Sequence, residues 1–463
     1  MRREHDLLGE LDIPEDAYYG IQTFRSVENF QITGLRLCDF PDFIKGLAYT
    51  KQAAAEANHE LGYLSDEVYK AMIQACKEVA EGKFDKEFVV DMIQGGAGTS
   101  TNMNANEVIA NRANEILGKA KGTYSPCHPN NHVNFAQSTN DAYPTAAKLG
   151  ISLNTPALID ELKSLVASFR KKAQELGDNI KMGRTQLQDA VPMTLGQEFE
   201  SYAASLENEI PQIQFARENL HTINMGATAI GTGINSDPNY TPKVTSHLAK
   251  ISGLDLKAAK NMIAATNDTS DFVTYSSQLK RLSAKLSKIC SDLRLLSSGP
   301  RTGLYDIGLP PMQPGSSIMP GKVNPVIPEV VNQVCYRVIG NDTAVILAAE
   351  SAQLELNVFE PVMIYSIFES IKLLINAMKT LRERCVTGIV GNYEHCKESV
   401  HRSIGLVTAL NPVIGYEASS DIAKTALRDN RSVYDLVLER GLLSKEKLDE
   451  VLKPENMTKP RKL

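Results

Sequence analysis

The sequence has no excess of positive charge and no long apolar run. Its 49 lysine and arginine residues are outnumbered by 55 aspartate and glutamate residues, giving a formal net charge of −6. Nucleic acids need a basic face against their phosphates, so this balance argues against such a partner. No uninterrupted apolar stretch approaches the length of a membrane span, and the polar start Met1–Asp6 lacks the apolar core of a secretory signal. We therefore expect a cytoplasmic protein with no nucleic-acid or membrane partner.

The sequence also lacks cysteine and histidine spacings that are typical of metal sites. Its seven cysteines are scattered, their number is odd, and no C-x-x-C occurs. We interpret them as reduced thiols that mostly pack in the interior. His128 and His132 are four residues apart, but Pro129 lies between them and further ligands are missing. We predict a plain loop at this position and no metal site.

Helical periodicity dominates the middle of the chain, whereas strand-like alternation is scarce. Between Phe272 and Leu296, apolar residues recur at alternating steps of three and four, and Ser297-Ser298-Gly299-Pro300 then stops the pattern. The segments 158–169, 195–220 and 364–381 repeat such a stripe. Long helices with narrow apolar stripes favour a mainly α fold with an elongated bundle. The spacing leaves open whether the stripes are buried within one chain or between subunits.

Three regions are predicted along the chain. Residues 1–139 mix shorter helices with loops rich in glycine and asparagine, and residues 140–395 carry the long helices. Residues 396–463 form a small C-terminal helical domain, whose last residues, 457–463, are predicted to be a frayed tail.

One loop carries a dense set of hydrogen-bond donors. It reads Gly315-Ser316-Ser317-Ile318-Met319-Pro320-Gly321-Lys322-Val323-Asn324-Pro325. Its glycines and prolines exclude a regular helix or strand, and its lysine, carboxamide, hydroxyls and backbone N–H groups offer an anion site. A phosphate-binding P-loop is excluded, because five residues instead of four separate Gly315 from Gly321 and Val323 replaces the required hydroxyl. The remaining alternative is a surface loop that merely ends a helix.

Three further polar clusters stand far apart in the sequence, at 94–104, 137–141 and 183–192. The first two are also compatible with a glycine-rich turn and an ordinary helix N-cap, respectively. The third cluster, Gly183-Arg184-Thr185-Gln186-Leu187-Gln188-Asp189-Ala190-Val191-Pro192, has too many polar groups for a bundle core unless they bind something. We interpret all three as loop-like segments.

In this order, the four clusters resemble the signature segments of the aspartase/fumarase superfamily of lyases, whose serine loop reads G-S-S-x-x-P-x-K-x-N. The resemblance extends from Ala17 to Leu443. It implies an all-α, three-domain subunit with a long central helix bundle that assembles in a homotetramer, with each active site shared between three subunits. It implies a small dicarboxylate as the substrate, and neither a metal ion nor an organic cofactor.

Carried over residue by residue, the resemblance also implies a role for each polar side chain. Ser316 is the catalytic base that removes a proton from carbon. Lys322 and Asn324 bind one carboxylate of the substrate, and Ser317 helps to hold the other. The other substrate-binding residues are Thr99, Ser138, Thr139, Asn140, Thr185 and Gln186.

Local differences favour the aspartase branch of the superfamily over the fumarase branch. Gln186 stands where fumarases have His, and Ala142-Tyr143 stand where fumarases have Thr-Phe. Elimination of water benefits from an acid–base group because hydroxide leaves poorly, whereas an ammonium group leaves as neutral ammonia. We therefore expect reversible deamination of L-aspartate to fumarate and ammonia through an aci-carboxylate intermediate.

Three alternatives remain for the function. Hydration of fumarate to malate on the same scaffold is the first. A non-enzymatic, crystallin-like structural descendant is less favoured, because Ser316, Lys322 and Asn324 are intact. A helical interaction scaffold would not need four polar clusters.

Overall fold

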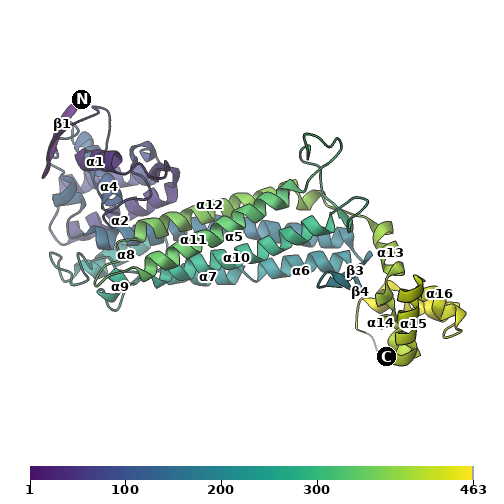
Figure 1. The fold of residues 1–463 in the computed structure, drawn as a ribbon. Coiled ribbons are helices and arrows are strands. Elements are labelled where there is room, and N and C mark those ends of the chain that lie inside the picture. The colour runs from purple at the N-terminus through teal and green to yellow at the C-terminus, as the bar shows by residue number, and fades with distance from the viewer. Residues whose placement is uncertain (461–463) are drawn as a thin grey trace. The chain divides into compact units, whose positions relative to one another are not determined.

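The computed structural model describes residues 1–460; residues 461–463, the end of the expected frayed tail, lie outside the described residues. Helices dominate (Figure 1). The α-helices are α1 (Ile21–Asn29), α2 (Pro41–Glu60), α3 (Asp66–Ala80), α4 (Thr99–Ile116), α5 (Thr139–Leu176), α6 (Leu195–Glu207), α7 (Ile210–Asn219), α8 (Tyr240–Ser252), α9 (Ala264–Asn267), α10 (Ser270–Leu296), α11 (Val326–Glu350), α12 (Glu360–Arg384), α13 (Tyr393–Arg402), α14 (Val407–Ile414), α15 (Tyr416–Asp429), α16 (Val433–Glu439), α17 (Lys445–Val451) and α18 (Pro454–Met457).

Strands are short and pair only two by two within the described part of the chain. Three pairs are antiparallel: β1 (Arg2–Asp6) with β2 (Gly9–Ile13), β3 (Ile180–Thr185) with β4 (Gln188–Thr194), and β7 (Ile307–Gly308) with β8 (Val390–Gly391). One pair, β5 (Thr222–Ile223) with β6 (Lys257–Ala258), is parallel. The predicted all-α class is confirmed.

The chain divides into two compact units. Unit 1 consists of Met1–Ile159, Pro211–Arg281 and Tyr336–Leu374, and unit 2 consists of Asp160–Ile210, Leu282–Cys335 and Ile375–Leu463. Helices α5, α10, α11 and α12 contribute residues to both units. The predicted division into three domains, with boundaries at 139 and 395, remains a prediction.

Side-chain hydrogen bonds link the four long helices to one another. In unit 1, Thr155 of α5 bonds to Tyr275 of α10 at 2.7 Å. Ser276 of α10 donates to Asp342 of α11 at 2.8 Å, and Asn341 of α11 donates to Ser370 of α12 at 3.1 Å. In unit 2, Arg382 of α12 donates to Glu161 of α5 at 2.8 Å. These links fix the helices of the bundle that the sequence predicted.

The apolar stripe of α10 is buried along its whole length. Its members are Phe272, Tyr275, Leu279, Leu282, Leu286, Ile289, Leu293 and Leu296. The helix ends at Leu296, directly before Ser297-Ser298-Gly299-Pro300, so the predicted stop is confirmed. The segment 360–388 is long and apolar enough to cross a membrane, but 67% of its most apolar window is buried inside the protein. That burial is typical of a core helix.

Three local predictions were wrong. The stripe at 195–220 is not one helix, because α6 ends at Glu207 and α7 begins at Ile210; Pro211, which lacks a backbone N–H, starts a helix more readily than it continues one. The cluster at 183–192 is not a loop but part of the β3–β4 hairpin. The segment Pro129–Val133 is a short π-helix instead of a plain loop; the His128 ring accepts the N–H groups of Asn130 and Asn131 and caps it.

Candidate functional site

The serine loop, residues 315–325, precedes α11 in unit 2 and is closed by two hydrogen bonds. The backbone N–H of Gly315 donates to the Lys322 carbonyl at 2.7 Å, and the Asn324 side-chain amide donates to the Gly315 carbonyl at 2.8 Å. A Cβ at position 315 would lie 2.7 Å from the Lys322 oxygen and 2.8 Å from the Asn324 nitrogen. Only glycine fits at this point, which explains the first residue of the loop motif.

Within this loop, two backbone N–H groups are directed at the Ser316 hydroxyl. Ile318 N and Met319 N donate to Ser316 Oγ at 3.2 and 3.1 Å. Such donors stabilise a negative oxygen more than a neutral hydroxyl, so they favour deprotonation. Lys322 is exposed, and no carboxylate within residues 1–460 pairs with its ammonium group. The loop therefore combines a polarised serine with an unpaired cation.

The second group of predicted residues in unit 2 lies at the tip of the β3–β4 hairpin. Thr185 and Gln186 are exposed there, and the two turn residues Gln186 and Leu187 have φ values of 52° and 62°. Positive φ at both central residues is the signature of a type I′ turn, which usually takes Asn or Gly. A strained non-glycine turn is retained where the surrounding structure fixes it.

Ionic contacts at the base of the hairpin hold this tip in place. Arg184 donates to Asp306 at 2.7 Å, and Lys181 lies 3.3 Å from the same carboxylate. On the other strand, Ser403 donates to Asp189 at 2.9 Å. No sequence pattern indicates Asp306, because it lies more than a hundred positions from the hairpin and in no motif.

In unit 1, the N-termini of α4 and α5 come together. Gly98, with a φ of 92°, precedes α4, and a Cβ on it would lie 2.5 Å from the Tyr143 ring on the first turns of α5. Thr99 is exposed at the first position of α4, where its hydroxyl donates to Gly96 at 2.7 Å. Helix N-termini carry free N–H groups and a partial positive charge, so two of them favour an anion such as a carboxylate.

The predicted residues Ser138, Thr139 and Asn140 lie at the start of α5. Asn102 of α4 donates to the Thr139 hydroxyl at 3.2 Å, which ties the two helix starts to each other. The Asn140 side chain donates to the carbonyl of Ala229 at 2.7 Å. The structure therefore brings Thr99, Ser138, Thr139 and Asn140 into one cluster of unit 1. The predicted residues of unit 2 lie in two other places, the tip of the β3–β4 hairpin and the serine loop.

Asp141 is a functional candidate that sequence reasoning did not single out. Its buried carboxylate accepts the backbone N–H groups of Ser138 at 2.9 Å, Gly226 at 3.1 Å and Thr228 at 2.9 Å. Burial raises the pKa of Asp141 to about 6, against the effect of these hydrogen bonds and of Lys51. Asp141 fixes the segment around Thr228 beside Ser138 and Asn140. Lys51, a fully buried cation of α2, was missed as well.

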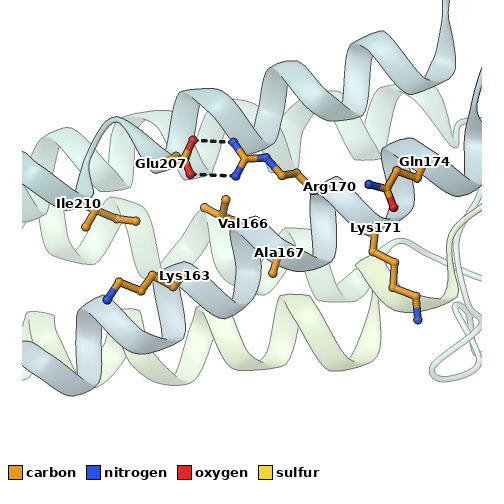
Figure 2. A pocket seen from close by; sticks show the side chains of 8 residues that line it. All are labelled: Lys163, Val166, Ala167, Arg170, Lys171, Gln174, Glu207 and Ile210. Atoms are coloured by element: carbon orange, nitrogen blue, oxygen red, sulfur yellow. Dashed lines mark hydrogen bonds and ion pairs between the residues drawn. The ribbon is translucent and has the colours of Figure 1, made fainter.

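The pocket drawn in Figure 2 lies elsewhere in unit 2. It is an open groove of about 330 Å³ lined by Lys163, Val166, Ala167, Arg170, Lys171, Gln174, Glu207 and Ile210. Arg170 donates to Glu207 at 2.8 Å and to Glu200 at 3.2 Å, so its charge is already neutralised. None of these lining residues belongs to the predicted site. Over residues 1–460, no three His, Cys, Asp or Glu side chains are grouped to hold a metal ion.

Comparison with known proteins shows the family of this chain. A family model described as "Lyase" matches residues 9–340, and one described as "Fumarase C C-terminus" matches residues 406–459. An aspartate ammonia-lyase of Pseudomonas aeruginosa is 58% identical over 99% of this chain and 97% of its own length.

The chain belongs to the aspartase/fumarase superfamily of lyases.

Solved structures of the superfamily share the fold. A fumarate lyase/delta crystallin from Brucella melitensis bound to cobalt superposes with a TM-score of 0.96, is 52% identical, and covers 99% of this chain and 100% of its own. A class II fumarase from Schistosoma mansoni superposes with a TM-score of 0.92 at 35% identity, covering 98% of both chains. The family resemblance read from the four polar clusters is thus confirmed.

Proposed function

We propose that this chain is an ammonia-lyase that interconverts L-aspartate with fumarate and ammonia in the cytoplasm. The observation that carries the proposal is the difference in sequence identity to two members of the superfamily. Identity reaches 58% with an aspartate ammonia-lyase, against 35% with a class II fumarase, at nearly full coverage of both. Gln186 supports the same choice, because its neutral amide can position an amino group but cannot supply a proton to departing hydroxide.

The serine loop is suited to bind one carboxylate of the substrate. Lys322 supplies an unpaired positive charge, and Asn324, which already donates to Gly315, keeps a second N–H for the ligand. The exposed apolar residues Ile318 and Met319, which are 83% and 47% accessible, lie between the serines and Lys322. Closure of the loop over a bound dicarboxylate would cover them and exclude water from the reaction.

In the proposed reaction, Ser316 removes the proton from the carbon beside the second carboxylate. Ser316 first loses its hydroxyl proton to solvent, and the alkoxide so formed then takes up the carbon proton. The two loop N–H groups on Ser316 Oγ and the positive charge of Lys322 in the same loop lower the cost of forming this alkoxide. The electron pair of the broken C–H bond moves onto the carboxylate and gives an aci-carboxylate with two negative charges. Collapse of this intermediate expels ammonia and forms the double bond of fumarate.

The aci-carboxylate needs donors that are already oriented. The unit 1 cluster, which contains Thr99, Ser138 and Thr139, supplies hydroxyl groups next to two helix N-termini, and Ser317 supplies a further hydroxyl from the serine loop. Preorganised donors of this kind contribute several kcal/mol to a transition state. The amino group and the other carboxylate of the substrate are held by the remaining predicted residues, Asn140, Thr185 and Gln186.

We further propose that the site is completed by other copies of the chain in a homotetramer. The required residues are distributed over unit 1 and unit 2, so neither unit carries the whole set. Helix α11 supports such an assembly, because it exposes Val330, Tyr336, Ile346 and Leu347 with accessibilities of 43%, 59%, 42% and 60%. These apolar side chains alternate with the exposed polar residues Gln333, Arg337 and Thr343. Exposed apolar side chains that recur along one helix are typical of an oligomer interface.

The test is direct, because fumarate absorbs in the ultraviolet and neither aspartate nor malate has its conjugated double bond. Purified protein is given L-aspartate, and the absorbance of fumarate and the release of ammonia are followed together. We expect both products in equal amounts, and little turnover of L-malate under the same conditions. Faster turnover of malate would overturn the proposal in favour of a fumarase, and no turnover of either would favour a structural descendant.

A further inference from the structure

A buried lysine lies behind the unit 1 cluster and contacts three amide side chains. Lys51 Nζ donates to Asn102 Oδ1 at 2.7 Å, to Gln137 Oε1 at 2.8 Å and to Asn134 Oδ1 at 3.1 Å. The residue itself is fully buried. Burial lowers the pKa of Lys51, and the carboxylate of Asp141 opposes that change. The ammonium form, which a pKa of about 7 leaves populated near neutral pH, donates to all three oxygens, whereas a neutral amine has one N–H fewer to donate.

The lysine determines which way each amide points. An ammonium group has three donors and no acceptor, so only the oxygen of an amide can face it. The Asn102 oxygen is therefore held toward Lys51 and its NH₂ group is directed away. Both hydrogens of that NH₂ are used: one is donated to Asn134 Oδ1 at 3.1 Å and the other to Thr139 Oγ1 at 3.2 Å.

The same logic fixes the hydroxyl of Thr139. The Thr139 oxygen accepts a hydrogen bond from the Asn102 NH₂ group. This NH₂ group is only a donor, so it cannot accept the Thr139 proton. No acceptor among the described residues takes up the Thr139 proton. The proton is thus free for a ligand on the side of the helix N-termini, where Thr99 and Ser138 also lie.

We propose that Lys51 and Asn102 are positioning residues: with Thr139 they form an oriented hydrogen-bond chain that directs the Thr139 hydroxyl proton at the substrate carboxylate. This inference rests on the proposed function, in which Thr139 stabilises the aci-carboxylate. The buried positive charge also polarises the chain along its length, since hydrogen bonds in series strengthen one another. Lys51 and Asn102 do not touch the substrate in this account.

Asn102→Asp is the variant that reverses the direction of the hydrogen bond between residues 102 and 139. The new carboxylate keeps its contact with Lys51 but cannot donate, so it draws the Thr139 proton inward, away from the substrate. Lys51→Met is the less informative change, because it leaves the amide oxygens of Asn102 and Gln137 without a donor and threatens folding. Asn102→Asp also adds a negative charge, so its effect is measured both in the wild-type background and in the Thr139→Val background. In the Thr139→Val background the added charge still acts, but the hydrogen-bond chain is absent because residue 139 has no hydroxyl.

For kcat/KM with L-aspartate, we expect Asn102→Asp to cost on the order of 10²-fold in the wild-type background. In the Thr139→Val background, the same change should cost at least about tenfold less. A residue that merely supports the fold would give the same factor in both backgrounds. Asn106→Asp is the matched control, because Asn106 lies one turn further along α4 and donates to the same Asn134 oxygen at 3.1 Å but does not contact Thr139. Its factor should not depend on Thr139.

Binding of succinate, a dicarboxylate that cannot react, is measured by calorimetry on the same set of variants. An inactive wild-type protein refutes the proposed function, while the succinate cycle still decides the inference. The hydrogen-bond chain is supported if the changes at positions 102 and 139 are coupled in kcat/KM or in succinate affinity, while the changes at positions 106 and 139 are not. Equal factors in both backgrounds, or wild-type protein that does not bind succinate, would overturn it.

Discussion

Asn324 donates its side-chain amide to the carbonyl of Gly315, nine residues earlier in the chain, at 2.8 Å. This bond turns the serine loop into a ring before any ligand is present. Ser316 and Lys322 are both held on that ring, the first by the N–H groups of Ile318 and Met319 and the second through its carbonyl. The loop thus needs little reordering to present its base and its cation to a substrate.

The two adjacent serines are expected to differ in function. Ser316→Ala should lower turnover of L-aspartate by orders of magnitude with little effect on substrate binding, because it removes the base. Ser317→Ala should lose one oriented donor, which costs on the order of 10²-fold. Exchange of the aspartate C3 proton with solvent, followed by NMR, isolates the proton-removal step. If Ser316→Ala exchanges this proton at the wild-type rate, another group is the base.

The ring itself is tested by Gly315→Ala. The added methyl group would lie 2.7 Å from the Lys322 carbonyl oxygen and 2.8 Å from the Asn324 backbone nitrogen, so the ring cannot close. We expect kcat to fall by at least about tenfold, while the unfolding midpoint hardly changes because the loop is exposed. Steady-state kinetics and thermal unfolding provide the two readouts. Wild-type kcat in a variant that folds would show that ring closure is not needed.

Gln186→His tests the choice between the two branches of the superfamily. The variant should keep activity toward L-aspartate, but its kcat/KM should fall as the pH drops below about 6.5, because an imidazolium repels the substrate ammonium group. Wild-type protein has no titrating group at this position. Gln188→His, two residues further along the same hairpin and equally exposed, is the control and should leave the pH profile unchanged. An unchanged profile in Gln186→His would place residue 186 away from the amino group.

The buried carboxylate of Asp141 predicts a pH-dependent stability. Burial raises its pKa from 3.8 to about 6 on folding, so the protonated form is favoured in the native state. Its contribution is therefore complete below pH 4 and is lost as the pH rises through 6, a change on the order of 3 kcal/mol. Asp141→Asn cannot titrate, so its unfolding free energy relative to wild type should rise by most of that amount, about 2 kcal/mol, between pH 4 and pH 6.5.

Urea unfolding of both proteins across this pH range measures the difference. A constant difference between Asp141→Asn and wild type would mean that Asp141 has an ordinary pKa in the folded protein.

Local patterns in the sequence were sufficient to predict the long helices and to single out the serine loop. The α10 stripe and its stop follow from spacing alone, and the serine loop follows from the density of glycine, proline and polar residues. The resemblance of the four clusters to one superfamily supplied the rest of the predicted residues. The β3–β4 hairpin was missed because its turn, Gln186-Leu187, lacks the Asn or Gly that normally marks a type I′ turn.

Long-range partners could not be predicted in the same way. Lys51 lies in an ordinary helical segment, and only the fold reveals that it faces Asn102 and Gln137 from inside the protein. Asp306 is likewise assigned to the hairpin only by its contact with Arg184. A single sequence shows which residue types are present, but not which of them meet across a helix interface.

The central claim is that a lyase site is completed by residues from different copies of the chain. Two variants test it, Ser316→Ala in unit 2 and Thr139→Val in unit 1, each nearly inactive alone. They are co-expressed with different affinity tags, and the hybrid oligomers are purified over both tags. If the two residues of each site come from different copies, random assembly restores about a quarter of the sites and thus about a quarter of the wild-type rate of fumarate formation. Hybrids no more active than the two parents would contradict the account.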